Sequence, residues 1–262
     1  MLKEQRCAII LSALKQKSSV TIDELVTLTQ SSRSTVHRDI ETLVSRHSLQ
    51  KIRGGVMKPK DDPVPGPAAS PVSEPPFLVR QDMYLEEKQR IAAAAHQYVK
   101  PNETLFLGGG TTVYEFAKTL YDIKPLYIAT NDLQSAFALA EFPNVDLNVL
   151  GGSLRQSHYS LNGYFTEQMI SQMHADTAFI GIDAVDLNIG YMNFSTSEIR
   201  TNKLMIQASH QTIILCDHSK FESVAFVNIC KLTDIDLLIT GKELKDSHAE
   251  RLKELGVNFL RV

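Results

Sequence analysis

The stretch LFLGGGTTVYEF, residues 105–116, joins a short apolar run to a segment with helical spacing through three glycines. Glycine lets the backbone approach an anion closely, and the free N–H groups at a helix start attract one. Similar pairs follow: LYIAT before LQSAFALAEF, TAFIGIDAV before a helix around residues 197–209, and IDLLIT before a helix near residues 246–255. This alternation predicts an α/β domain with a mainly parallel sheet.

Charge and proline content divide the 262 residues. Residues 1–60 contain 11 Lys and Arg against 5 Asp and Glu, a charge of +6, and the remainder has 16 against 25, or −9. PKDDPVPGPAASPVSEPP, residues 59–76, holds seven of the ten prolines and almost no large apolar side chain, which is typical of a linker. We therefore expect a basic domain over residues 1–58, this linker, and an acidic α/β domain over residues 77–262.

Composition argues against several classes of protein. The sequence shows no run of 18 or more apolar residues and no export signal, which predicts a cytoplasmic protein. Cys7, Cys216 and Cys230 have no CxxC spacing, so neither a disulfide framework nor a metal site is indicated. The glycine loop is neither GxGxxG nor a Walker A sequence, and we expect no cofactor.

The basic region contains three segments with helical spacing, followed by a small hairpin pattern. Thr21 and Glu24 have the spacing of a capping box that opens the second segment. The third segment has an apolar face formed by Val36, Ile40, Leu43 and Val44. LQKIRGGV, residues 49–56, alternates like a hairpin strand and ends in two glycines. This order predicts a winged helix-turn-helix.

In that fold the third helix enters the major groove of DNA and the hairpin touches the backbone. The predicted DNA-contacting residues are Arg33, Ser34, Thr35, His37 and Arg38 on the third helix, with Lys51 and Arg53 on the wing. Phosphate would repel Asp39, so we expect it to orient Arg38 or another basic side chain, with a solvated helix charge as the alternative. Docking of a protein partner is the alternative for the whole domain.

Polar residues also follow other predicted strands of the acidic region. Ligands of open parallel sheets sit outside the carboxyl ends of the strands, so these residues would lie along one edge. The predicted effector-binding residues are Gly109, Gly110, Thr111, Thr112, Asn131, Gly152, Asp183 and Lys220. The loop would hold a phosphate, the amide and carboxylates would bind hydroxyl groups, and the lysine would balance charge. Asp183, Asp186 and Asp217 have helix capping or turn formation as the alternative.

SSRSTVHRDIETLVSRHSLQKIRGGV, residues 31–56, resembles the signature of the DeoR family of bacterial transcription regulators. There, a Ser-x-x-Thr-[Ile/Val]-Arg-Arg-Asp-Leu helix precedes a wing that ends in Gly-Gly. The matching residues are Thr35, Val36, Arg38, Asp39, Gly54 and Gly55. His37 replaces the first of the paired arginines, and Val44 replaces a glutamate. The acidic region resembles the family too, through its GTT loop, the TN after the next strand, a GG pair, Gly163, AFIGID and the DHSKF of residues 217–221.

The effector domain of that family is similar to ribose phosphate isomerase and to related sugar isomerase and CoA-transferase-like folds. The isomerase DGAD segment corresponds to residues 183–186 here, without its glycine, and the isomerase Lys-Gly-Gly-Gly run is missing. Glu198 stands near the place of the catalytic carboxylate and joins the predicted effector-binding residues, with helix-start capping as its alternative. The resemblance implies binding of a sugar phosphate without turnover.

The resulting hypothesis is a DNA-binding repressor of a bacterial carbohydrate-utilisation operon, and not an enzyme. A phosphorylated sugar or sugar derivative would bind the acidic domain and change the affinity for operator DNA. Operator symmetry and the resemblance imply a homodimer or homotetramer. The alternative is a sugar phosphate isomerase-like enzyme with an appended helical domain.

Overall fold

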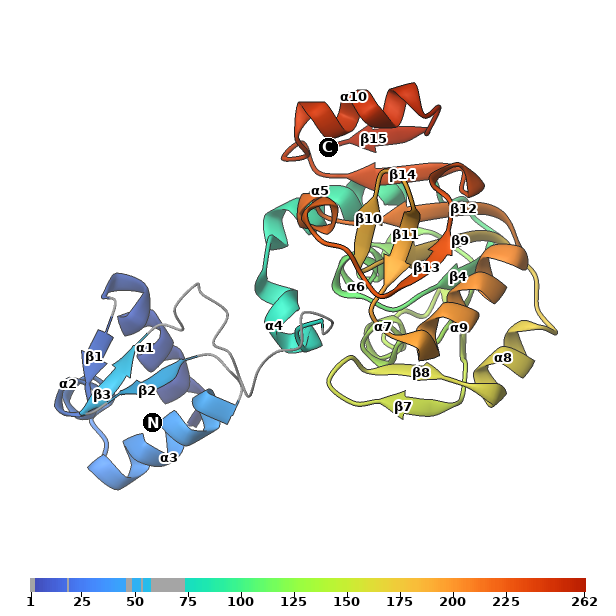
Figure 1. Cartoon of the computed structure of the whole chain (residues 1–262). Coiled ribbons are helices and arrows are strands. Elements are labelled where there is room, and N and C mark those ends of the chain that lie inside the picture. The colour runs from blue at the N-terminus through green and yellow to red at the C-terminus, as the bar shows by residue number, and fades with distance from the viewer. Residues whose placement is uncertain (1–2, 18, 46–48, 53, 58–73) are drawn as a thin grey trace. The chain divides into compact units, whose positions relative to one another are not determined.

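The chain forms two compact units, Met1–Ser70 and Pro71–Val262, in a computed structural model (Figure 1). The residues that the structure describes are 3–17, 19–45, 49–52, 54–57 and 74–262. Most of the predicted linker therefore lies outside the described residues. None of the helices in the described part of the chain is long and apolar enough to cross a membrane.

The first unit is a winged helix-turn-helix, as the sequence predicts. Its elements are α1 (Lys3–Gln16), β1 (Ser19–Thr21), α2 (Ile22–Thr29), α3 (Arg33–Ser45), β2 (Gln50–Ile52) and β3 (Gly55–Met57). β3 pairs antiparallel with β2 in the predicted hairpin and with β1 on its other side. β1 was not predicted, because three residues are too short to show a period.

Local signals explain where the helices of this unit begin. Thr21 and Glu24 form the predicted capping box, in which the Glu24 N–H donates to Thr21 Oγ1 at 3.3 Å and the Thr21 N–H donates to the Glu24 carboxylate at 2.9 Å. Val36, Ile40 and Leu43 are buried in the core, but Val44 is exposed at the end of α3 and its predicted place on the apolar face is wrong.

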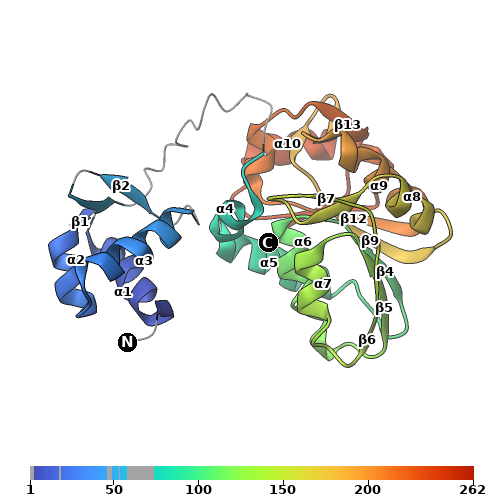
Figure 2. The same ribbon diagram turned by 90° about the horizontal axis from the view of Figure 1, so that it is seen from below.

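The second unit is built on a seven-stranded sheet in which every neighbouring pair is parallel, in the order β15-β14-β12-β9-β4-β5-β6 (Figures 1 and 2). Its strands are β4 (Thr104–Leu107), β5 (Leu126–Thr130), β6 (Val145–Val149), β9 (Ala175–Gly181), β12 (Ser209–Leu215), β14 (Leu237–Thr240) and β15 (Phe259–Arg261). The mainly parallel α/β fold is thus confirmed.

Helices cover both faces of this sheet (Figure 2). They are α4 (Phe77–Asp82), α5 (Leu85–His96), α6 (Thr111–Ala117), α7 (Leu133–Leu139), α8 (Tyr164–Ile170), α9 (Thr196–Gln207) and α10 (Asp246–Glu254). Successive strand residues alternate between two apolar clusters: Leu105 and Leu107 pack with α5, α6 and α7, whereas Phe106 packs with α8, α9 and α10. Strands buried on both faces explain the continuous apolar runs in the sequence.

Two smaller antiparallel sheets accompany the large one, and residues of the second, such as Tyr191, pack into the apolar core. β7 (Ser153–Arg155) pairs with β8 (Ser160–Asn162), and β11 (Gly190–Asn193) lies between β10 (Ala184–Asp186) and β13 (Val227–Cys230). They place the segments that follow β6 and β9 beside the carboxyl edge of the large sheet.

Candidate functional site

A polar pocket lies at the point where the strand order of the large sheet reverses. From the central strand β4 the chain continues to β5 and β6 on one side of the sheet. The strand on the other side of β4 is β9, and from there the chain continues to β12, β14 and β15. Residues after both strands, including Gly109, Gly110 and Asp183, line the pocket. Such a switch point is where open α/β sheets bind their ligands.

Two glycines make the approach of these loops possible. Gly110 has a φ of +123°, a backbone conformation that side chains other than glycine rarely adopt. Gly181, at the end of β9, lies against the carbonyl oxygen of Gly109, and a Cβ at this position would clash with that oxygen. The glycine loop therefore lies directly on the neighbouring strand.

The structure brings most of the predicted effector-binding residues together. Those that line the pocket are Gly109, Gly110, Thr111, Thr112, Asn131, Asp183, Glu198 and Lys220. Gly152 is not among the lining residues: it packs against Asn162 and Thr166, and the hydroxyl of Thr166 donates to the Gly151 carbonyl at 2.6 Å.

The other aspartates considered from the sequence have local partners. Asp186 accepts the N–H groups of Asn188 and Ile189 at 2.8 and 2.9 Å, which is a turn role. Asp217 caps the turn that carries Lys220 by accepting the Ser219 N–H at 3.1 Å. Capping and turn formation, the alternatives left open for these two residues, describe their contacts.

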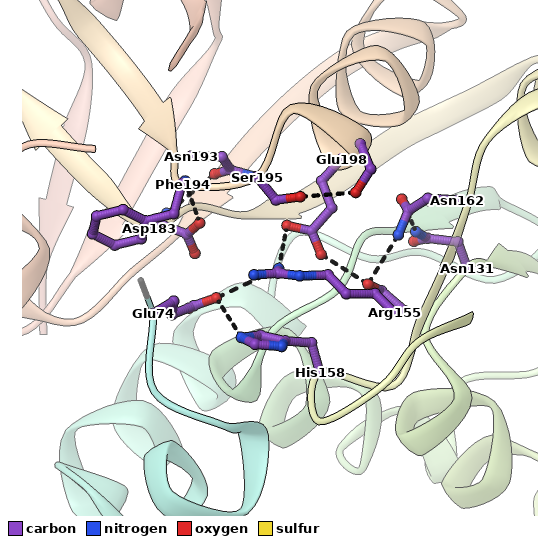
Figure 3. Close-up of polar contacts among 12 residues, drawn as sticks. Glu74, Asn131, Arg155, His158, Asn162, Asp183, Asn193, Phe194, Ser195 and Glu198 are labelled. Carbon is purple, nitrogen blue, oxygen red and sulfur yellow. Dashed lines mark hydrogen bonds and ion pairs between the residues drawn. The ribbon is translucent and has the colours of Figure 1, made fainter. Parts of the chain in front are cut away.

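Sequence reasoning missed an acidic residue and three basic ones at this site. Glu74 lies just before α4, Arg80 lies within α4, and Arg155 and His158 come from the β7–β8 hairpin. Glu74 forms an ion pair with Arg80. It also lies 3.2 Å from His158 Nε2 and 3.7 Å from Arg155 Nη1 (Figure 3). Spacing along the chain gives no signal for Arg155 and His158, because the hairpin brings them to Glu74 and Arg80 only in the folded protein.

Arg155 also joins this group to Glu198. Its guanidinium lies 2.8 Å from Glu198 Oε2, and the other carboxylate oxygen of Glu198 accepts the Ser160 hydroxyl at 2.8 Å (Figure 3). Lys220 Nζ lies 4.0 Å from Glu74. The pocket thus contains a network of alternating charges in which Glu198 of α9 is held in place by residues of β7 and β8.

The pKa values of two neighbouring carboxyl groups move in opposite directions. Burial, the charge of Glu74 and a hydrogen bond with it raise the pKa of Asp183 well above its usual range. Burial opposes ionisation of Glu74, but the hydrogen bond of His158 and the charge of Arg80 hold its pKa below the usual value. Burial and the charge of Glu74 therefore favour the protonated form of Asp183 over its ionised form.

Asn131 and Asp132 lie beneath the glycine loop. Asn131 Nδ2 donates to the Leu161 carbonyl at 3.0 Å, and its Oδ1 is buried without a hydrogen-bond partner among the described residues. Asp132 caps α7 by accepting the Ser135 N–H at 2.7 Å, and burial raises its pKa to about 6. An unpaired buried acceptor is costly, so Asn131 Oδ1 is suited to a ligand hydroxyl.

A second cluster, Glu87, Asp217 and His218, has the residue types of a metal site. Its donors already serve the protein, because the N–H and Nδ1 of His218 each lie 2.7 Å from a carboxylate oxygen of Glu87. Burial also lowers the pKa of the neighbouring Lys88 to about 8, against the opposing charge of Asp217. We interpret the cluster as a support for the segment 217–221 that carries Lys220.

The predicted DNA-contacting residues of the first unit lie on α3 and β2. Arg33, Ser34, Arg38 and Lys51 are exposed, and Thr35 and His37 are half-buried. Arg33 pairs with Asp23 at 3.1 Å on the surface. Arg53 lies outside the described residues. The exposed side chains of α3 match the groove-facing pattern of a recognition helix.

Asp39 has the orienting role that the sequence suggested. Its carboxylate is buried and accepts two hydrogen bonds from the Arg6 guanidinium, at 2.6 and 3.2 Å. The partner is thus a basic residue of α1 and not Arg38, which leaves Arg38 exposed on α3.

A winged helix-turn-helix followed by an α/β domain with a polar switch-point pocket is typical of DNA-binding regulators that respond to a small ligand. Two domain families match the chain: the DeoR-like helix-turn-helix domain over residues 6–61 and the DeoR C terminal sensor domain over residues 84–242. The chain belongs to the DeoR family of transcriptional regulators.

Curated relatives span nearly the whole chain. The HTH-type transcriptional repressor GlcR of Bacillus subtilis is 30% identical over 260 residues, which is 99% of this chain and 96% of the relative. The glycerol-3-phosphate regulon repressor of Escherichia coli K12 is 30% identical over 240 residues, or 92% and 91%. A putative aga operon transcriptional repressor of Escherichia coli O157:H7 is 28% identical over 253 residues, or 97% and 91%.

These comparisons decide between the two functions left open by the sequence. The family and its curated relatives are regulators, so the interpretation as a regulator is confirmed and the isomerase-like enzyme is not supported. Among solved structures, ribose 5-phosphate isomerase from Plasmodium falciparum is 22% identical with a TM-score of 0.37, and covers 51% of this chain and 52% of that chain. A likeness of this degree carries no argument about activity.

Proposed function

We propose that the chain represses a carbohydrate-utilisation operon and that a phosphorylated sugar or sugar derivative, bound in the switch-point pocket, changes its affinity for operator DNA. The observation that carries this proposal is the composition of the pocket. The glycine-threonine loop, Lys220 and Arg80 face the same space as Asn131 and Asp183. Backbone N–H groups and cations suit a phosphate, and amide and carboxyl groups suit sugar hydroxyls.

The arrangement favours binding over chemistry. Asp183 and Glu198, the two carboxyl groups nearest to an isomerase role, are both engaged: Asp183 accepts the Phe194 N–H at 2.9 Å, and Glu198 pairs with Arg155. A general base has to be free to reach the proton that it removes. We assign both groups to holding the ligand.

Residues of α3 and the wing would make the DNA contacts. Arg38 and Lys51 are exposed and basic, and the surrounding unit carries the positive charge of the chain. Pseudo-palindromic operators require a symmetric protein, so we propose a homodimer or homotetramer that acts on DNA in the cytoplasm.

Binding of DNA by the full-length protein tests this proposal. A duplex would be selected from a random-sequence pool, and its affinity would be measured by fluorescence anisotropy with and without a panel of pentose and hexose phosphates. At least one sugar phosphate should change the affinity for DNA by fivefold or more, which corresponds to a coupling free energy of about 1 kcal/mol or more. The unphosphorylated sugar should have no effect. Equal affinities across the whole panel would contradict the proposed function.

A further inference from the structure

Glu74 is a buried carboxylate among the basic side chains of the sensor pocket. Its side chain is 3% exposed and lies among Arg80, Arg155, His158 and Lys220, all of which belong to the folded sensor unit. Glu74 itself precedes the first helix of that unit and belongs to no helix or strand. A carboxylate from outside the sheet and its helices thus neutralises the cations of the site.

An N–H donor that points at Glu74 is not available to a phosphate at the same time. Charged donors bind a carboxylate and a phosphate through the same kind of hydrogen bond. A phosphate that entered beside Glu74 would meet its charge and that of Glu198 in a buried site, where like charges repel strongly. The ligand anion and Glu74 therefore compete for one position.

Two other carboxyl groups lower the cost of releasing Glu74 from the pocket. The charge of Glu74 opposes ionisation of the neighbouring buried Asp183. Glu198 adds a further negative charge near Asp183. Removal of Glu74 relieves this repulsion, which offsets part of the cost of breaking its ion pairs.

Phe77 anchors the chain that follows Glu74 to the sensor core. The ring of Phe77 is fully buried, with edge contacts to Tyr114 and Tyr159, and its N–H donates to the Ser157 carbonyl at 2.7 Å. Displacement of Glu74 would therefore move the chain that precedes Phe77 and leave the chain after it in place. The preceding chain leads back to Met57, the last residue of the wing.

We propose that Glu74 is an internal ligand of the sensor pocket, which the anionic group of the effector displaces, and that this displacement reports occupancy of the pocket to the DNA-binding unit through the connecting chain. The inference rests on the proposed function, because it assumes that the pocket receives an anion. To the proposed function it adds Glu74 as the group that competes with the effector, and the connecting chain as the covalent route of the signal.

The test compares Glu74→Gln with Glu86→Gln, which makes the same change on the exposed surface of α5. Inorganic phosphate is the probe, titrated at constant ionic strength against the full-length protein and followed by isothermal titration calorimetry. A site that is open in only a tenth of the molecules binds about tenfold more weakly than an open one. Glu74→Gln should therefore bind phosphate about tenfold more tightly than the wild type, and Glu86→Gln should bind like the wild type.

Two further variants keep the comparison decisive. Adding Lys220→Ala to Glu74→Gln should remove the gain, because the phosphate then loses a cation of the pocket. Glu74→Asp retains the charge but shortens the side chain, so it should show a smaller gain in phosphate affinity. It replaces Glu74→Gln in the comparison if Glu74→Gln is unstable. Unchanged or weaker phosphate binding in folded Glu74 variants, or a gain that persists without Lys220, overturns the proposal.

The DNA affinity supplies the second readout. Without any effector, Glu74→Gln should bind the selected duplex with the affinity of effector-saturated wild type, whichever direction the effector acts. An affinity equal to that of the effector-free wild type overturns the signalling part. If no sugar phosphate affects DNA binding by the wild type, the proposed function fails, yet the phosphate comparison still stands. If a sugar phosphate changes the DNA affinity of the wild type but Glu74→Gln does not bind phosphate more tightly, the role of Glu74 is rejected and the proposed function stands.

Discussion

Arg6 on α1 and Asp39 on α3 form a two-point ion pair inside the DNA-binding unit, with Arg6 Nε 2.6 Å from Asp39 Oδ2 and Arg6 Nη2 3.2 Å from Asp39 Oδ1. The two residues are 33 positions apart, and the pair fixes α3 against the first helix. A buried carboxylate with such a partner is a structural element of the domain, even though it lies within the DNA-binding signature.

We expect Arg6→Met to destabilise the DNA-binding unit by about 3 kcal/mol, because loss of one partner leaves the buried Asp39 charge uncompensated. Urea unfolding followed by far-UV circular dichroism measures the loss. Arg6→Met combined with Asp39→Leu should recover part of it, since both charges are then gone. If Arg6→Met and the wild type have the same urea midpoint of unfolding, the ion pair does not stabilise the DNA-binding unit.

Arg38→Ala should weaken DNA binding at least tenfold while leaving the fold intact, because Arg38 is exposed on α3. Loss of one phosphate contact also lowers the slope of log affinity against log salt by about 1. Anisotropy titrations at several salt concentrations give both quantities. Arg251→Ala, which removes an exposed arginine of α10, is the matched control and should change neither. Wild-type affinity in Arg38→Ala would exclude this contact.

Thr111→Val should weaken the sugar phosphate response about tenfold, because valine keeps the shape of threonine and removes a hydroxyl from the pocket. DNA affinity without ligand should stay unchanged. Thr233→Val, at an exposed threonine of the short 3-10 helix Leu232–Asp234, provides the control. The measurement is the effector concentration for a half-maximal change in DNA binding. An unaltered midpoint in Thr111→Val would place the phosphate elsewhere in the pocket.

Asp132→Asn should become more stable relative to the wild type as the pH rises. The folded pKa of Asp132, about 6, lies above its unfolded value of 3.8, so its favourable contribution is complete below about pH 4 and is lost as the pH rises through 6. The difference in unfolding free energy should grow by about 2 kcal/mol between pH 4.5 and pH 8. Asparagine can still cap α7.

Tyrosine fluorescence suits this measurement. All eight tyrosines lie at residue 84 or beyond, and the chain has no tryptophan, so the signal reports the sensor unit alone. Urea midpoints of Asp132→Asn and wild type that run parallel across this pH range would show that Asp132 is not a buried, protonated acid.

Periodicity predicted β4, β5, β9 and β14 of the large sheet because these strands are continuous apolar runs, such as Leu105–Leu107 within β4. It did not predict the edge strand β15 or the helices α4, α5 and α8. It did not predict β10, β11 and β13 as a sheet, since their pairing joins residues as distant as Tyr191 and Cys230. Local patterns carry no information about a partner 39 positions away. β1 was missed because its three residues are too few to show a period.

The candidate site shows a similar division. Gly109 and Thr111 could be named because glycine and threonine directly after a strand have a local meaning. Arg155 and His158 belong to a hairpin that reaches the site only in the folded protein. Glu74 was missed for another reason: the proline-rich composition around it indicates a linker, and composition averages over a segment and conceals one buried carboxylate.

The place of Glu74, three residues before Phe77, bears on how the sensor unit is produced as a separate protein. A fragment that begins at residue 77 keeps the Phe77 ring and the whole sheet but lacks the carboxylate that pairs with Arg80 and His158. One that begins at residue 71 retains it. Ligand screens on the two fragments would compare two different receptors, and the shorter one would bind anions more tightly than the regulator itself.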